Sequence, residues 1–465
     1  MKLFERFFYP GLLTIVLAAL MVRVFQLATS SYWLDEFVTV NFASFPNWSA
    51  LFWDNHPPLY YLLMKGWIAL FGPWEFATRS FSLLCSLGTT ITLGLWGRRL
   101  KDARLGLLLA ALSVLQPLTF IYAREARMYA LFEFFATLQL WMFWEYYQDA
   151  KKWRGFLITS ILISITHYFS GPLLLVESAL LLAWKRNFKS RNTFWIVGFC
   201  GGLMLLFFIH QFSWSHLEWQ KLKFDAEPES RWPLQSLLLL GWGSWVGALA
   251  TFFIAVLVFK KNELLKICSA LCLSIFFMCL VFAWATGRAI FLPRYFIFLT
   301  PEVIVLTGLG LFELPFHTKK RGPALIAGLL LIGGIALHLP LLYKNSKTPW
   351  RKAAKIIELT PNSVVYTTRT LAIRSPYFES KNIPVMRIFP EEKGLKQIIH
   401  SLDEGKQVWV LENYFGAQAY FSSLRTQLSN RLYEIEDFTL MDDGSDPALL
   451  LHVQIPNRQE ALPHN

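Results

Sequence analysis

Over its first 342 residues the chain alternates long apolar blocks with short polar segments, and these polar segments are mostly basic. Most of the blocks extend over roughly 17–25 residues, which is the length that an α-helix needs to cross the hydrocarbon core of a bilayer. The pattern therefore predicts a polytopic α-helical membrane protein with about 11 transmembrane helices. We expect them at about 10–28, 76–97, 105–122, 128–147, 155–184 (two short spans), 194–212, 236–259, 264–286, from about 293 to before Lys319, and 323–342.

The basic segments indicate which end of each block faces the cytoplasm, because cytoplasmic loops carry an excess of Lys and Arg. Lys2 and Arg6 precede the first block, so we predict a cytoplasmic N-terminus. The next strong block ends at the basic cluster Arg98–Arg104, and the residues before that block, about 29–75, then form an outer loop. An apolar stretch of about 15 residues after Pro58 is too short for a span, so we predict an interfacial helix there.

The block 155–184 has basic residues on both sides, so it must cross the membrane an even number of times. Its roughly 30 residues are short for two full spans. We expect its turn at Thr166–Pro172, inside the membrane envelope, where irregular backbone is tolerated only beside protein or a cavity. This pattern predicts that His167 lies near a cavity.

The tail, residues 343–465, has a different pattern. An amphipathic helix is predicted from Trp350 to Leu359, and short apolar runs at 363–366 and 407–411 are typical of strands. Its length suits one small α/β domain. We therefore predict a transmembrane domain at 1–342 and an extracytoplasmic α/β domain at 343–465.

The composition agrees with a membrane protein. Hydrophobic residues make up 54% of the 465 residues and charged residues only 16%, whereas soluble domains are about one quarter charged. The net charge of +12 comes from short loops between apolar blocks, which fits membrane orientation better than nucleic-acid binding. The five cysteines all lie within apolar blocks, so neither a disulfide framework nor a cysteine metal site is indicated: Cys85, Cys200, Cys268, Cys272 and Cys279.

Two adjacent carboxylates, Asp35 and Glu36, follow the first block on its outer side. They are either the solvated start of a loop or a functional group, because carboxylates at a membrane interface are costly unless solvated or used. Glycosyl transfer to a hydroxyl needs a carboxylate that accepts the acceptor's proton. Asp35 is our candidate for this general base, and Glu36 would tune its pKa or orient the acceptor.

Arginines on the outer side form a second candidate group, since they go against the usual charge bias. Arg124, Arg127 and Tyr129 lie at the outer end of the third and fourth blocks, and Arg294 with Tyr295 begins the tenth. These arginines either snorkel to lipid headgroups or bind a phosphate, which a guanidinium grips with two parallel hydrogen bonds.

Further polar residues could be accessory groups that contact the acceptor. His56 and Tyr60 flank paired prolines at the start of the interfacial helix, His167 lies in the broken helix pair, and Glu218 lies in a polar outer loop at 213–234. Each histidine is equally well explained as an exposed or satisfied structural residue.

Four short motifs occur in the order typical of a known family. Together they resemble the GT-C glycosyltransferases of the protein O-mannosyltransferase type, which include the bacterial aminoarabinose transferase of lipid A. The resemblance covers about residues 1–315 well and the tail more loosely. The motifs are Asp35-Glu36, His56-Pro57-Pro58-Leu59-Tyr60, Ala123-Arg124-Glu125-Ala126-Arg127-Met128-Tyr129 and Arg294-Tyr295-Phe296.

The resemblance implies a polyprenyl-phosphate-linked sugar donor, an extracytoplasmic acceptor (a cell-envelope glycan, a lipid or a protein) and inversion at the anomeric carbon. It implies Asp35 as the catalytic base and phosphate binding by Arg127 and Arg294, with Arg124 as a further candidate. Some relatives hold a divalent metal through an acidic residue where this chain has Asn55-His56, so metal dependence is left open and no cofactor is assigned.

The expected location is the bacterial inner membrane, with the C-terminal domain outside the cytoplasm. The alternative function is a transporter or flippase of lipid-linked sugars, which would move the lipid without breaking a bond. The candidate groups gather at the outer face and not at the bilayer midplane, which favours the enzyme.

Overall fold

The computed structural model is made of two compact units. One contains Met1–Leu27 and Phe42–Leu342, and the other contains Ala28–Asn41 and Tyr343–Asn465; we call them the helical unit and the sheet unit. Predicted spans 194–212 and 323–342 fall almost wholly outside the described residues. The structure describes residues 2–47, 56–184, 198–199, 201–202, 233–258, 262–286, 292–314, 328–329, 331–333, 336, 350–367, 376–379, 381–387, 392–413, 424–430, 433–440 and 448–454.

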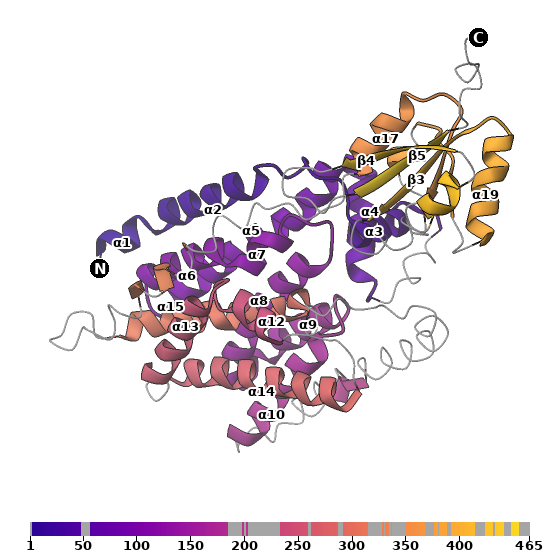
Figure 1. Ribbon diagram of the computed structural model, residues 1–465. Helices are drawn as coiled ribbons and strands as arrows, with labels where there is room; N and C mark the ends of the chain where they lie inside the picture. The colour runs from indigo at the N-terminus through magenta and orange to yellow at the C-terminus, as the bar shows by residue number, and fades with distance from the viewer. Residues whose placement is uncertain are drawn as a thin grey trace, which may run out of the picture. The chain divides into compact units, whose positions relative to one another are not determined.

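The helical unit contains only helices in the part of the chain that the structure describes (Figure 1). Helix α3 begins in the sheet unit and ends in this one. In chain order the helices are α1 (Lys2–Arg6), α2 (Phe8–Val24), α3 (Leu34–Ser44), α4 (Leu59–Phe71), α5 (Glu75–Leu100), α6 (Ala103–Leu115), α7 (Pro117–Tyr122), α8 (Tyr129–Gln148), η2 (Ala150–Lys152), α9 (Trp153–Ser164), α10 (Ser170–Trp184), α12 (Pro233–Leu240), α13 (Trp245–Val258), α14 (Glu263–Thr286), η4 (Pro293–Leu299) and α15 (Thr300–Glu313).

Three helices among the described residues are long and apolar enough to cross a membrane: Glu75–Leu100, Glu263–Trp284 and Pro293–Glu313. The stretch after Pro58 forms the 13-residue helix α4. The break expected within 155–184 lies between Ser164 and Ser170, where α9 ends and α10 begins. The total of about 11 spans stays a prediction.

Two spans that we predicted as single helices are each divided into two helices, so these two predictions were wrong about helix continuity. The span 105–122 is divided at Gln116, because Pro117 cannot continue the preceding helix and instead begins α7, capped by the Gln116 side chain. The span 236–259 is divided between α12 and α13, because Trp242 and Gly243 adopt positive φ angles of 68° and 76°.

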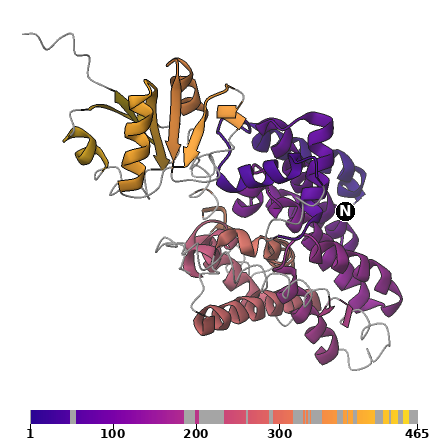
Figure 2. The same cartoon turned by 90° about the vertical axis from the view of Figure 1, so that its right-hand side faces the viewer.

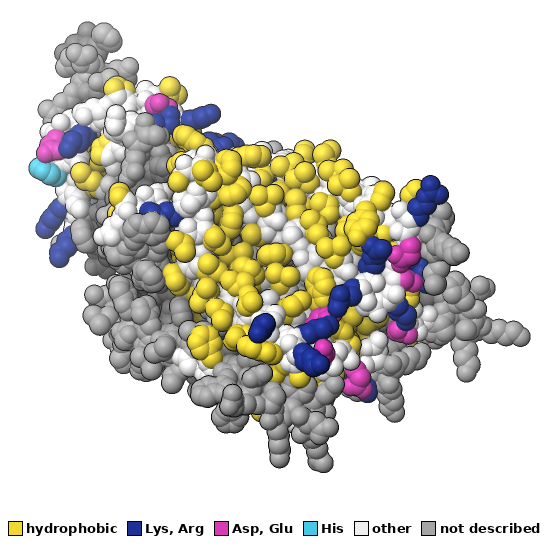
Figure 3. All heavy atoms as spheres, turned by 180° about the vertical axis from the view of Figure 1, so that it is seen from behind, with side chains coloured by type: hydrophobic (Ala, Val, Ile, Leu, Met, Phe, Trp, Pro, Cys, Tyr) yellow, Lys and Arg dark blue, Asp and Glu magenta, His cyan; other side chains and the backbone are white. Residues whose placement is uncertain are grey.

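One face of the molecule carries a broad hydrophobic surface over the helices, with charged side chains gathered toward one end (Figure 3). Large apolar side chains are exposed on several helices, including Met21 at 70%, Phe252 at 65% and Trp284 at 88%. Soluble monomers rarely expose contiguous apolar patches of more than a few hundred Å². A lipid environment explains this surface.

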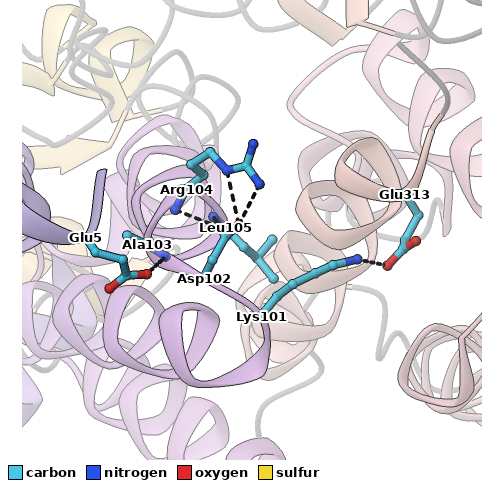
Figure 4. A network of polar contacts seen from close by, with 7 residues as sticks. All are labelled: Glu5, Lys101, Asp102, Ala103, Arg104, Leu105 and Glu313. Carbon is cyan, nitrogen blue, oxygen red and sulfur yellow. Dashed lines mark hydrogen bonds and ion pairs between the residues drawn. The ribbon is translucent and has the colours of Figure 1, made fainter. Parts of the chain in front are cut away.

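A network of polar contacts fixes the short loop between α5 and α6 (Figure 4). Asp102 caps α6 by accepting hydrogen bonds from the backbone N–H groups of Arg104 (2.9 Å) and Leu105 (3.1 Å). Burial acts to raise the pKa of Asp102, but its hydrogen bonds with the Arg104 side chain and the backbone outweigh this effect, so the pKa lies below its ordinary value. Glu5 of α1 and Glu313 of α15 also bind this loop.

The sheet unit contains a five-stranded mixed sheet in the order β2-β1-β3-β5-β4. Strand β1 pairs in parallel with β2 and β3, whereas β5 pairs antiparallel with β3 and β4. The two apolar runs noted in the tail form β1 and β3. The elements are α17 (Trp350–Glu358), β1 (Ser363–Thr367), α18 (Pro376–Glu379), β2 (Val385–Arg387), α19 (Glu392–Asp403), β3 (Gln407–Asn413), β4 (Glu434–Leu440) and β5 (Ala448–Gln454).

The core of this unit lies between the sheet and α19 (Figure 2). Leu395 and Ile398 of α19 pack with Val408 and Val410 of β3, all nearly or fully buried. The described residues of this unit thus combine helices with a mixed sheet.

Candidate active site

Two arginines of the helical unit come close to one buried histidine. Arg127 directly precedes α8 and is 3% exposed, and Arg294 lies in η4. His167, between α9 and α10, is fully buried. Both guanidinium groups lie over tyrosine rings that neighbour it, Arg127 at 5.9 Å from Tyr129 and Arg294 at 5.6 Å from Tyr295. Two segments far apart in the sequence therefore bring guanidinium groups near His167.

Aromatic rings surround His167 on several sides. Its ring stacks on Phe132 of α8 at 4.8 Å between centroids and on Tyr168 at 4.5 Å. Tyr129 lies at 5.9 Å and Tyr295 at 6.0 Å. Both tyrosines were candidates from sequence, and the structure brings them together with His167.

His56 joins this group from the start of α4. Its ring centroid lies 5.5 Å from that of His167 and 5.6 Å from that of Tyr168. The backbone N–H of Leu59 donates to the carbonyl of Ile165 at 3.2 Å, which ties the start of α4 to the end of α9. We call His56, Arg127, His167, Tyr168, Arg294 and Tyr295 the arginine–histidine cluster.

Tyr60 has a supporting position. Its hydroxyl lies 3.2 Å from the Ser82 hydroxyl, which donates to the carbonyl oxygen of Arg127 at 3.3 Å. The next residue, Tyr61, places its hydroxyl 3.5 Å from a guanidinium nitrogen of Arg127. Tyr60 is therefore linked to the Arg127 backbone through Ser82, and Tyr61 contacts the Arg127 side chain.

Helix α8 is linked to η4 by a buried carboxylate. Glu133 accepts hydrogen bonds from the hydroxyls of Thr119 in α7 and Thr300 at the junction of η4 and α15, the latter at 2.6 Å. Since Arg127 precedes α8 and Arg294 lies in η4, this carboxylate fixes the two arginine-bearing segments relative to each other.

The acidic pair lies in the first turn of α3, within the part of that helix that belongs to the sheet unit. Glu36 is fully buried, and its carboxylate accepts a hydrogen bond from the backbone N–H of Trp33 at 3.2 Å. This contact is half of a capping box, in which an acidic third residue binds the N–H group of the N-cap. Asp35 is half-buried, and carboxylates are favourable at this end of a helix.

Two other candidates lie elsewhere. Arg124 donates to the backbone carbonyls of Phe25 and Gln26 at 2.9 and 3.1 Å, which positions it at the end of α2. Glu218 lies outside the described residues. Tyr61 and Tyr168 were not predicted as site residues, although each directly follows a predicted one, Tyr60 or His167.

The described residues do not bring three His, Cys, Asp or Glu side chains together as metal ligands. His56 is described, but Asn55 beside it is not.

The chain is similar to known proteins in part of its sequence and in its fold. Residues 55–214 match the family model for dolichyl-phosphate-mannose-protein mannosyltransferases. The crystal structure of ArnT from Cupriavidus metallidurans in the apo state has a TM-score of 0.58 at 13% sequence identity, over 95% of this chain and 97% of that chain. No curated protein matches the sequence.

Two further solved structures share the fold. ArnT from the same organism bound to undecaprenyl phosphate gives a TM-score of 0.56 at 14% identity, over 95% of this chain and 97% of the other. The Archaeoglobus fulgidus oligosaccharyltransferase in complex with Zn and sulfate gives 0.50 at 11% identity, over 91% and 72%.

The chain therefore shares the fold of ArnT, which is a GT-C fold. The family-model match over residues 55–214 and this fold both agree with the resemblance drawn from the motifs.

Proposed function

We propose that this protein transfers a sugar from a polyprenyl-phosphate carrier to an extracytoplasmic acceptor, with inversion at the anomeric carbon. The acceptor would be a cell-envelope glycan, a lipid or a protein. The proposed location is a bacterial inner membrane, with the N-terminus in the cytoplasm and the sheet unit outside it.

The observation that carries this proposal is that the Arg127 and Arg294 guanidinium groups lie 5.9 and 5.6 Å from the rings of Tyr129 and Tyr295. Those two rings are in turn 5.9 and 6.0 Å from the ring of the buried His167. Guanidinium groups are suited to a phosphate because their planar fork donates two parallel hydrogen bonds. The relative bound to undecaprenyl phosphate supports a lipid phosphate as the ligand of these two groups.

In the proposed reaction the Asp35 carboxylate accepts the proton of the acceptor hydroxyl. The acceptor oxygen forms a bond to the anomeric carbon while the bond from that carbon to the phosphate oxygen breaks. Arg127 and Arg294 stabilise the charge that develops on the departing polyprenyl phosphate. Glu36 caps α3 and so positions Asp35.

The test uses purified protein in nanodiscs with a panel of radiolabelled polyprenyl-phosphate sugars, and it measures release of polyprenyl phosphate. Asp35→Asn keeps the side-chain size and removes the base, so we expect release to fall at least about 100-fold. Asp403→Asn is the matched control, since Asp403 is an exposed residue of α19, and it should leave release unchanged.

Near-normal release by Asp35→Asn would remove Asp35 as the base. A transporter would bind the lipid-linked sugars and leave them intact in both proteins. The proposed function would be contradicted if every donor in the panel were bound but none were cleaved, even after acceptor extracts are added.

A further inference from the structure

His167 occupies an irregular turn that its own backbone helps to close. Its N–H donates to the carbonyl of Ile163 at 3.2 Å, and its carbonyl accepts from the N–H of Ser170 at 3.1 Å. The side chain is fully buried, and its ring is stacked between neighbours. The imidazole therefore has one fixed orientation.

The hydrogen bond at one ring nitrogen determines the tautomer. The backbone N–H of Phe169 donates to Nδ1 of His167 at 3.2 Å, so Nδ1 is an acceptor. In a neutral imidazole the proton then resides on Nε2, which becomes a donor. Nε2 is buried and has no hydrogen-bond partner among the residues that the structure describes. Buried N–H groups are nearly always hydrogen-bonded, because leaving one unsatisfied is costly.

The surroundings of this donor indicate which kind of partner would suit it. The rings of Tyr129 and Tyr295 lie 5.9 and 6.0 Å from the His167 ring. The guanidinium groups of Arg127 and Arg294 lie 5.9 and 5.6 Å from these two tyrosine rings. The other rings around His167 are those of His56, Phe132, Tyr168 and Phe169. An N–H donor near two guanidinium groups is suited to an anionic oxygen.

We propose that His167 is a neutral third donor to the lipid phosphate, which binds a non-bridging phosphate oxygen through Nε2–H beside Arg127 and Arg294. This inference rests on the proposed function and assigns a binding role to a histidine that the sequence had suggested only as an accessory group. Because the donor is neutral, it adds a hydrogen bond without adding a third positive charge.

Three substitutions separate the hydrogen bond from the packing of the ring. In His167→Gln the side-chain amide can reach the position of Nε2 and keep a donor there. In His167→Asn the shorter amide reaches only the position of Nδ1. In His167→Phe the ring remains and both nitrogens are lost. The matched control is His400→Gln, since His400 is a highly exposed residue of α19, with 77% of its side chain accessible.

The first measurement is the affinity of the full-length protein in nanodiscs for undecaprenyl phosphate without a sugar. We expect affinity about tenfold weaker in His167→Phe and His167→Asn, close to wild type in His167→Gln, and unchanged in His400→Gln. Thermal unfolding of each variant shows that it is folded, and rescue by Gln but not by Asn is a result that ring packing alone would not give.

The outcomes also separate this inference from the proposed function. Wild-type protein that binds no undecaprenyl phosphate would contradict both. Wild-type binding with equal affinity in folded His167→Phe would overturn only the role of His167. Equal losses in His167→Gln and His167→Phe would show that a donor at the position of Nε2 does not restore binding, and this result would also overturn the role of His167. A loss for the sugar-linked donor alone would place the contact on the sugar and not on the phosphate.

Discussion

At the scale of single residues, burial distinguishes Arg127 from Arg124. Arg127 is 3% exposed, its guanidinium carbon lies 5.9 Å from the centre of the Tyr129 ring, and the Tyr61 hydroxyl is 3.5 Å away. Arg124 instead donates to two backbone carbonyls at the end of α2. A rigid, buried guanidinium presents its hydrogen-bond fork in one orientation, which a flexible ammonium group cannot reproduce.

We therefore predict that Arg127→Lys and Arg294→Lys each raise the KM for the lipid-linked donor by about tenfold or more, although the charge is kept. Steady-state release of polyprenyl phosphate measures this effect. Arg99→Lys is the control, because its side chain is 57% exposed and forms an ion pair with Glu145. A KM in Arg127→Lys equal to that of wild type would show that the arginine acts only as a charge or not at all.

Part of this cluster was predictable from sequence, because outer-side arginines go against the charge bias of membrane proteins. That argument identified Arg127 and Arg294. It could not identify Tyr61 or Tyr168, since aromatic residues make up 16% of the chain and one more tyrosine beside a motif carries no signal. Their roles depend on how α4, α8 and η4 pack, which the local pattern does not contain.

At the scale of elements, the Glu133 carboxylate links α7, α8 and the junction of η4 with α15. The same oxygen accepts from the hydroxyls of Thr119 and Thr300. An apolar replacement would leave the buried Thr119 hydroxyl without this acceptor, at a cost of about 1–3 kcal/mol. The Thr300 hydroxyl would still have the carbonyl of Ile297 as an acceptor at 2.8 Å, but it would no longer link η4 to α8.

We expect Glu133→Leu to lower the free energy of unfolding by about 2 kcal/mol or more, and to reduce sugar transfer by displacing Arg294. Glu133→Gln keeps one carbonyl oxygen as an acceptor and should retain most of both properties. Thermal unfolding and donor KM are measured together for the two variants. Equal behaviour of Gln and Leu would mean that the hydroxyl contacts do not hold η4 in place.

The helix breaks show which features of the fold the local sequence pattern can predict. The break between α9 and α10 followed from length and flanking charge, because about 30 residues cannot make two full spans. The break at Pro117 had a visible cause, yet the apolar run continued through it and was predicted as one helix. The break at Trp242 and Gly243 depends on positive φ angles, and a tryptophan gives no indication of such a conformation.

At the scale of the whole molecule, residues far apart in sequence build the sheet unit. The Tyr377 hydroxyl accepts a hydrogen bond from the backbone N–H of Tyr32 at 2.9 Å, and the Arg351 N–H donates to the Ser31 hydroxyl at 3.1 Å. The acidic pair of α3 therefore belongs with the tail. Sequence periodicity contains no information about such pairings, which is why the prediction placed 29–75 entirely with the membrane domain.

The predicted orientation of the chain is tested by fusions at each end. Alkaline phosphatase attached after the C-terminus should be active, because it folds only after export, whereas a green fluorescent protein there should be dark. A green fluorescent protein at the N-terminus should fluoresce, as the Lys2 and Arg6 pair predicts. Fluorescence from the C-terminal fusion would reverse the orientation and place the sheet unit in the cytoplasm.

The stability of the sheet unit should depend on pH through His452 of β5. Its ring stacks on Trp409 at 4.0 Å, and its Nε2 lies 2.9 Å from Oε1 of Gln407. Burial lowers the pKa of His452 below its ordinary value of 6.5, and this effect exceeds the opposing influence of Glu436. Below pH 6.5 the unfolded state therefore binds more protons than the folded state, so the free energy of unfolding falls as the pH falls through this range.

Hydrogen exchange of the β3 and β5 peptides in the full-length protein should therefore show easier opening at a pH of about 5.5 than at about 7.5, after correction for intrinsic rates. His452→Gln replaces the ring with a side chain that does not titrate, and it should lose most of this pH dependence even if it is less stable overall. Opening that is equally pH-dependent in this variant would assign the effect to another group. Opening that is independent of pH in the wild type would mean that His452 has the same pKa in the folded and unfolded states.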